Sequence, residues 1–277
     1  MAVQIPVLTY HAANVAGAEY AENDHVALAA DLRLVDGLGW RVLSLDQVLA
    51  VLDGSLAPPS PRCLAVTFDD GTDFDVRPLD WPGQGRQPGF GPILADFRAE
   101  AGDRQPDLHA TSFVIASPAA RAAMDEQCLH GAGVLNDDWW PEAAASGLLA
   151  IGNHSWDHNH PVAPEAAPDG LKRGDFLAVD NAVRAAWQVA RAQAFIAARV
   201  APAPVRHFAY PWGQAPDYLR RHWLPRHGPR LGLVAAWTTQ PRPARPGDDR
   251  WALPRYVCGA HWRSPDQLAD LLAGSAA

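Results

Sequence analysis

Six short apolar runs, four to seven residues long, recur along this chain and alternate with amphipathic segments. The runs are typical of buried strands and cover residues 5–9, 63–68, 110–116, 148–151, 205–210 and 231–236. Helical spacing of apolar residues appears over residues 26–38, 45–52, 175–199 and 264–272. Strands that alternate with helices indicate a parallel sheet or an α/β barrel. We therefore predict an α/β fold.

The length and composition favour a single domain. The chain has 277 residues, 48% of them hydrophobic, which is enough for one sizeable core, and no linker divides it. We expect one domain over residues 1–277. Two long segments interrupt the alternation, a Gly- and Pro-rich stretch at 72–91 and a Pro-rich stretch at 159–174, and a shorter loop follows at 242–249. Loops of this length commonly shape a site.

Charge and cysteine content exclude several classes of function. The net charge is -8 and Lys172 is the sole lysine, so no basic patch suggests nucleic acid as a partner. The three cysteines lack Cys-x-x-Cys spacing, which argues against a thiolate zinc site or a disulfide framework. We see neither a secretory signal nor an apolar stretch long enough to span a membrane, so we expect a cytoplasmic protein.

Polar side chains follow four of the predicted strands at their C-terminal ends. They are Tyr10 and His11, then Asp69 and Asp70 before Gly71, then His154 and His158, and finally the Pro-Trp-Gly segment 211–213. In barrels and open parallel sheets, active sites are built at that edge. We therefore expect these four clusters to converge.

The convergence would produce a metal site. Adjacent aspartates can divide labour, one binding a cation while the other takes a proton from water. His154 and His158 are four residues apart, and with a neighbouring aspartate they complete three ligands, leaving a position open for water. The set contains no thiolate, so Zn is our default and Co, Ni, Fe or Mn would also suit. The alternative is an ordinary Asp-Gly turn with two surface histidines. We expect His160, His207, His222 and His227 to be structural or solvated.

The motifs resemble those of polysaccharide deacetylases with the chitooligosaccharide deacetylase (NodB-type) homology domain. Six elements occur in one order: Val7-Leu-Thr-Tyr-His11, Leu64-Ala-Val-Thr-Phe-Asp-Asp-Gly71, Ala110-Thr-Ser-Phe-Val114, Ile151-Gly-Asn-His-Ser-Trp-Asp-His158, Phe208-Ala-Tyr-Pro-Trp-Gly213 and Leu253-Pro-Arg255. The resemblance implies a distorted (β/α) barrel and metal-dependent removal of N-acetyl, sometimes O-acetyl, groups from sugars.

The resemblance also implies individual roles. Asp69 would be the catalytic base, and Asp70, His154 and His158 would bind the metal. In the segment that contains Tyr210 and Trp212, which would face the substrate, the backbone N–H of Trp212 would stabilise the oxyanion.

Two departures from the family pattern concern the groups that complete the reaction. Ala209 stands where many members have an arginine that orients the base, so Arg255 is our candidate replacement. The late Leu-x-His motif is absent, so His11 and His261 are candidates for the general acid. The segment between Gly71 and Ala110 is longer than usual, which suggests an altered substrate pocket.

Two other functions are compatible with the sequence. A metal-dependent amidase of the same barrel could act on a small amide or imide instead of an acetylated glycan. A non-catalytic carbohydrate-binding protein could use exposed tryptophans as stacking platforms, namely Trp139, Trp140, Trp156 and Trp212.

Overall fold

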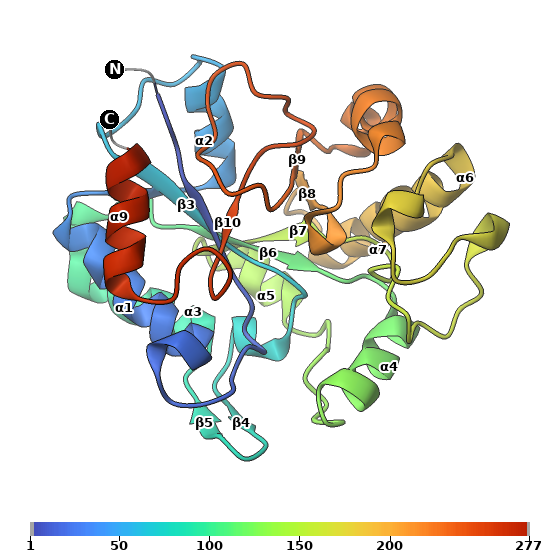
Figure 1. Cartoon of the computed structure of the whole chain (residues 1–277), viewed down its shortest axis with the longest axis horizontal. Coiled ribbons are helices and arrows are strands. Elements are labelled where there is room, and N and C mark those ends of the chain that lie inside the picture. Colours follow the sequence, from blue (N-terminus) through green and yellow to red (C-terminus); the bar gives the residue numbers. More distant parts are fainter. Residues whose placement is uncertain (1–2, 276–277) are drawn as a thin grey trace.

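A computed structural model describes residues 3–275, and its centre is one curled parallel sheet (Figure 1). The sheet order is β10-β1-β3-β6-β7-β8-β9, and β2 pairs with β3 outside that path. The strands are β1 (Val7–Tyr10), β2 (Arg41–Leu43), β3 (Cys63–Phe68), β6 (Ala110–Val114), β7 (Leu149–Asn153), β8 (His207–Ala209), β9 (Ala235–Trp237) and β10 (Tyr256–Val257). The predicted α/β fold is confirmed, in the form of an open half-barrel.

The central strands are buried on both faces, as continuous apolar runs require in a parallel sheet. All six residues of β3 and all five of β6 are buried. The registers place Tyr10 beside Phe68 and Phe68 beside Ser112. The strands β1 and β3 therefore end at one level and β6 continues beyond it to Val114, so the residues that follow these strands lie at the same edge of the sheet.

Helices cover the outside of the sheet. The α-helices are α1 (Asp24–Gly37), α2 (Leu45–Leu52), α3 (Phe90–Ala101), α4 (Pro118–Cys128), α5 (Trp140–Ala145), α6 (Ala182–Ala185), α7 (Arg191–Val200), α8 (Leu224–His227) and α9 (Pro265–Ser275). Capping residues fix where two of these helices begin. The Asn23 side chain caps α1, and Ser44 and Gln47 form a capping box on α2. In Figure 1, α1, α3 and α9 lie together on one side, and α4, α6 and α7 lie on the other.

Short helical turns complete the chain. The 3-10 turns are η1 (Tyr20–Glu22), η2 (Asp73–Asp75), η3 (Gly102–Arg104), η4 (Pro168–Gly170), η5 (Phe176–Ala178), η7 (Pro211–Gly213) and η9 (Pro229–Leu231), and the π-helical turns are η6 (Ala186–Ala190) and η8 (Leu219–Trp223). In residues 3–275, no helix combines the length and the apolar character that a bilayer crossing requires.

Three predicted segments differ in the structure. The stretch 72–91 contains a two-stranded hairpin, β4 (Leu79–Trp81) and β5 (Gly85–Gln87), rather than a plain loop. The helix expected over 175–199 is interrupted by η5, by the Asn181 cap of α6 and by η6. The strand expected over 231–236 begins later, at Ala235, because η9 occupies its first residue.

The segment after β9 lies along the open side of the sheet. Leu253 hydrogen-bonds through its backbone to Ala236 and Thr238 at the end of β9, and β10 pairs with β1 three residues later. The chain between these two points carries Arg255. Arg255 therefore lies between the β9 edge and the β1–β10 edge of the sheet, because the chain crosses from one to the other at this point.

Candidate metal and catalytic site

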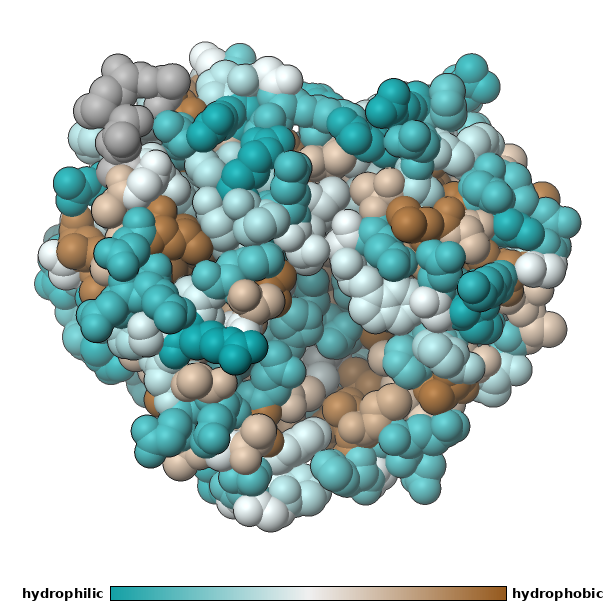
Figure 2. Space-filling view, in the orientation of Figure 1, coloured by the Kyte–Doolittle hydropathy of each residue, from teal (hydrophilic) through white to brown (hydrophobic). Residues whose placement is uncertain are grey.

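The residues predicted at the strand ends converge at the C-terminal edge of the sheet. Asp70 follows β3, His154 follows β7, and the turn η7 follows β8. Figure 2 shows a hollow near the middle of the face drawn, over the region where β6 and its neighbours end in Figure 1.

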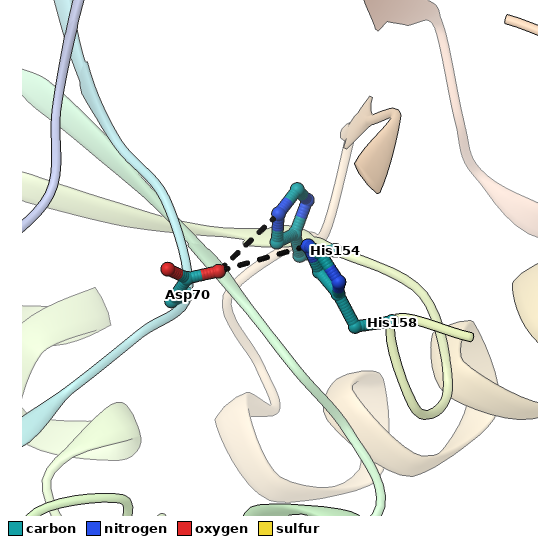
Figure 3. Close-up of side chains that lie close together, drawn as sticks. All are labelled: Asp70, His154 and His158. Carbon is teal, nitrogen blue, oxygen red and sulfur yellow. Dashed lines mark ion pairs between the residues drawn. The ribbon is translucent and has the colours of Figure 1, made fainter. Parts of the chain in front are cut away.

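Three side chains point at one another in this region (Figure 3). Asp70 Oδ1 lies 3.6 Å from His154 Nε2 and 3.8 Å from His158 Nε2. One ligand atom from each residue lies within 4.8 Å of the others. Both histidines are buried and Asp70 is partly exposed, so the group opens toward solvent on the aspartate side.

The surroundings of both rings suit metal binding. His154 Nδ1 lies 2.9 Å from the carbonyl oxygen of Ala209, which can only accept, so Nδ1 donates this bond and Nε2 is the nitrogen that faces Asp70. Burial, together with the neighbouring His154, lowers the pKa of His158 well below its usual value. Neutral imidazoles are the form in which histidine binds metals.

The spacing also fits a divalent ion. Ligands at about 2.0–2.1 Å in a tetrahedral arrangement are separated from one another by about 3.4 Å, close to the distances found. The donor set is two imidazole nitrogens and one carboxylate oxygen. Small movements of side chains would therefore complete three bonds and leave a position for water.

Asp69 is a buried carboxylate held by Arg255. The guanidinium donates from Nη1 to Oδ1 at 2.7 Å and from Nη2 to Oδ2 at 2.8 Å, and its Nε donates to the Thr238 carbonyl. Burial would raise the pKa of Asp69, but Arg255, and then the charges of His154 and His11, hold it well below its usual range. The structure thus pairs Arg255 with Asp69 through both carboxylate oxygens.

Backbone strain is concentrated at this site. Asp70, Ser155, His158, Asn159 and Trp212 all have φ between 47° and 76°, in the left-handed region that non-glycine residues rarely adopt. Such conformations persist where the surroundings fix them, and they cluster at functional sites.

The turn η7 presents Trp212 but not the side chain of Tyr210. The Trp212 ring is 42% exposed and packs edge-on against His158, with 4.5 Å between ring centroids. The N–H groups of Gly213 and Gln214 donate to the Tyr210 and Pro211 carbonyls, and the N–H of Trp212 takes no part in those bonds. Tyr210 is fully buried and its hydroxyl donates to the Trp251 carbonyl, so it supports the turn instead of facing substrate.

The two candidate acids differ in their surroundings. His11 follows Tyr10, whose carbonyl accepts from Asp69 N–H, and its own N–H donates to Asp24. Its buried Nδ1 has no hydrogen-bond partner among the residues described. His261 Nδ1 accepts from Val257 N–H in a local turn, which occupies one ring nitrogen. His11 therefore follows a residue bonded to Asp69, whereas His261 is held in a turn of its own.

His160 lies next to the candidate ligand group without belonging to it. Its ring centroid lies 6.1 Å from that of His158 and 6.5 Å from that of Trp212, so it borders the group. Its Nδ1 accepts from the Val162 N–H at 3.3 Å, which agrees with the structural role that we expected from sequence.

Three of the four tryptophans considered as stacking platforms are buried. Trp139 and Trp156 are each 4% exposed and Trp140 is fully buried. They belong to the core, as large apolar side chains usually do. That part of the carbohydrate-binding interpretation is wrong, and Trp212 alone of the four is exposed.

Comparisons with known proteins agree with the motifs. A family model described as polysaccharide deacetylase matches residues 57–223. No curated protein matches the sequence. Among solved structures, a deacetylase PplD from Streptococcus pyogenes, solved in complex with acetate, is 18% identical with a TM-score of 0.62, and the match covers 98% of this chain and 99% of that one.

Two further structures have the same fold. IcaB from Ammonifex degensii is 20% identical with a TM-score of 0.63, and the match covers 99% of this chain and 98% of that one. The putative polysaccharide deacetylase BA0330 from Bacillus anthracis is 14% identical with a TM-score of 0.61, covering 100% and 70%. At these identities the likeness shows the fold alone.

Proposed function

The chain belongs to the polysaccharide deacetylase family, and on that premise we propose that it removes acetyl groups from an N-acetylated (or O-acetylated) glycan with a bound divalent metal. The observation that carries the proposal is the juxtaposition of two units at one sheet edge. Asp70, His154 and His158 form a ligand group, and the adjacent Asp69 is buried, ionised and aligned by Arg255. A binding protein has no need for a buried carboxylate in that position.

Asp70, His154 and His158 would hold the metal, with Zn as our default and Co, Ni, Fe or Mn as alternatives. When bound, a divalent ion supplies Lewis-acid polarisation of the acyl oxygen and lowers the pKa of water. The fixed tautomer of His154 and the uncharged state of His158 prepare both rings for that role.

The remaining groups would divide the proton and charge transfers of amide hydrolysis. Asp69 accepts a proton from the attacking water, and Arg255 keeps both its oxygens oriented. The Trp212 N–H donates to the oxygen of the acetyl group as negative charge develops on it. As the C–N bond breaks, His11 donates a proton to the leaving amine, which departs as the free amino sugar while acetate forms.

An acetate-release assay tests the proposal. Zn-loaded protein is incubated with acetylated chitooligosaccharides, peptidoglycan fragments, and small amides including a cyclic imide. We expect acetate from a glycan, and we expect Asp69→Asn to bind Zn normally but release acetate at least about 100-fold more slowly.

Two outcomes would contradict the proposal. Hydrolysis of small amides without acetate release from any glycan would identify a metalloamidase of the same fold. Near-normal activity of Asp69→Asn would remove the assigned base.

A further inference from the structure

The segment that carries two of the proposed metal ligands is short and strained. Between His154 and Asn159, three residues, Ser155, His158 and Asn159, have left-handed backbone conformations. Such a segment would relax to other conformations without external support. The contacts that support it therefore decide where the His158 ring lies.

One support is the π-helical turn η6. A π-turn inserted between α6 and α7 shifts the usual helical hydrogen bonding and leaves backbone carbonyls available to other groups. The Gln188 carbonyl accepts from Trp156 N–H at 2.8 Å, and the Val189 carbonyl accepts from Asn153 Nδ2 at 3.2 Å. Both donors flank His154 in the chain.

The second support is Asp157, which is fully buried beside His158. Gln188 Nε2 donates to Asp157 Oδ1 at 2.7 Å, and Arg173 Nη1 donates to Oδ2 at 2.6 Å. Arg173 also donates to the Glu165 carbonyl, which ties the segment to the long loop 159–174. Asp157 is thus fixed from both sides, by η6 and by that loop.

Gln188 is unfavourable for the stability of the fold in one respect. Its side chain is fully buried, yet its Oε1 has no hydrogen-bond partner among residues 3–275. An unpaired buried acceptor destabilises a fold. Stability alone therefore does not explain the side chain, whereas its hydrogen bond to Asp157 in the ligand segment does.

We propose that the π-helical turn η6 is a positioning device for the metal site, in which Gln188 fixes the segment 154–158 through its carbonyl and through Asp157. Gln188 touches neither substrate nor metal, so it is a positioning residue. The proposal rests on the proposed function, because it presumes that His154 and His158 bind metal.

The test measures metal affinity in Gln188→Leu, which removes the side-chain amide and keeps a similar volume. Zn²⁺ affinity is determined by competition with a chelator, and the Co²⁺-loaded protein is compared by visible absorption, which reports ligand geometry. We expect affinity to fall about ten-fold or more and the Co²⁺ spectrum to change, because partners of ligand segments have effects of that size.

The matched control is Gln105→Leu. Gln105 is also buried and donates to the Trp40 carbonyl and to Asp36, outside the ligand segment. We expect this variant to lower the melting temperature while its Zn²⁺ affinity stays within two-fold of wild type.

Wild-type affinity and an unchanged Co²⁺ spectrum in Gln188→Leu would overturn the positioning role and leave the proposed function intact. Absence of metal binding by the wild-type protein would instead overturn the proposed function, and this inference with it. If Gln188→Leu does not fold, Arg173→Met loosens Asp157 from the loop side, and the same fall in affinity is expected.

Discussion

At the scale of single residues, Asp69 is a charged side chain buried at the end of β3, and Arg255 compensates its charge. The two lie 186 positions apart, so no local pattern connects them. The sequence could suggest Arg255 because many members of the family have an arginine at the position of Ala209, and another arginine was needed to take its place. Asp69, Asp70, His154 and His158 were easier to single out as candidates, because each stands in a short motif after an apolar run.

The pairing of Asp69 with Arg255 should contribute strongly to the free energy of unfolding. Arg255→Met leaves a buried carboxylate without its partner, so we expect the free energy of unfolding to fall by about 3–5 kcal/mol. In Asp69→Asn/Arg255→Met neither charge remains, and the loss should be much smaller than the sum of the two single losses. Urea denaturation of the metal-free proteins measures the free energy of unfolding of Asp69→Asn, of Arg255→Met and of the double variant. Additive losses would show that the two side chains do not depend on each other.

At the scale of elements, long apolar runs and clear caps were predictable, whereas short or irregular pieces were not. The strand at 63–68 and the helix at 45–52 have the predicted bounds, since one is wholly buried and the other begins with a capping box. The strands β2 and β10 are two or three residues long, which is too short for a periodic pattern. Ala-rich sequence around η6 has helical propensity throughout, so it gave no sign of a π-turn.

The turn η7 depends on Gly213, whose φ is 68°. A Cβ at this position would lie 2.8 Å from the Thr239 backbone nitrogen, so Gly213→Ala must displace the turn that presents the Trp212 N–H. We expect kcat for acetate release to fall about ten-fold or more, with Zn²⁺ affinity unchanged, because the donor to the oxyanion moves.

The control for that prediction is Gly54→Ala. Gly54 also has a positive φ, of 80°, but nothing lies within 4 Å of a Cβ there. This variant should lose some stability and keep its activity. Equal kcat values in the two variants would mean that η7 does not contribute to turnover.

At the scale of the whole molecule, the parallel arrangement was predictable and the pairing of its last strand was not. Alternating strands and helices require crossovers, and crossovers give a parallel sheet. The pairing of β10 with β1 joins segments nearly 250 residues apart, and the two residues of β10 carry no pattern that specifies it. The position of Arg255 depends on that pairing, so the sequence could only suggest Arg255, and its contact with Asp69 became visible in the structure.

An ion pair between distant elements should make stability depend on pH. Asp46 in the first turn of α2 contacts Arg206 at 2.8 Å and His207 at 3.1 Å, both at the start of β8. Burial alone would raise the pKa of Asp46, but His207 and Arg206 lower it from 3.8 to about 2. A lowered pKa means that the contribution is fully present above about pH 4 and is lost as pH falls toward 2.

We therefore expect Asp46→Asn to lower the melting temperature by about 1–3 °C at pH 7, since Asp46 is half exposed and such pairs are weak. The difference from wild type should shrink below pH 4. Asp266→Asn, in the first turn of α9, controls for loss of a helix-terminal charge. A difference that stays constant from pH 7 to pH 2 would show that the carboxylate charge is not responsible.

In the proposed function, Asp70, His154 and His158 hold a metal on which deacetylation depends. The most direct measurement titrates Zn²⁺ into metal-free protein while acetate release from an acetylated chitooligosaccharide is followed. We predict that activity rises linearly and reaches its plateau at one equivalent of Zn²⁺ per chain, and that His154→Ala shows no such rise. Full activity of the metal-free protein, or an equal rise in His154→Ala, would show that deacetylation does not depend on a metal held by these residues.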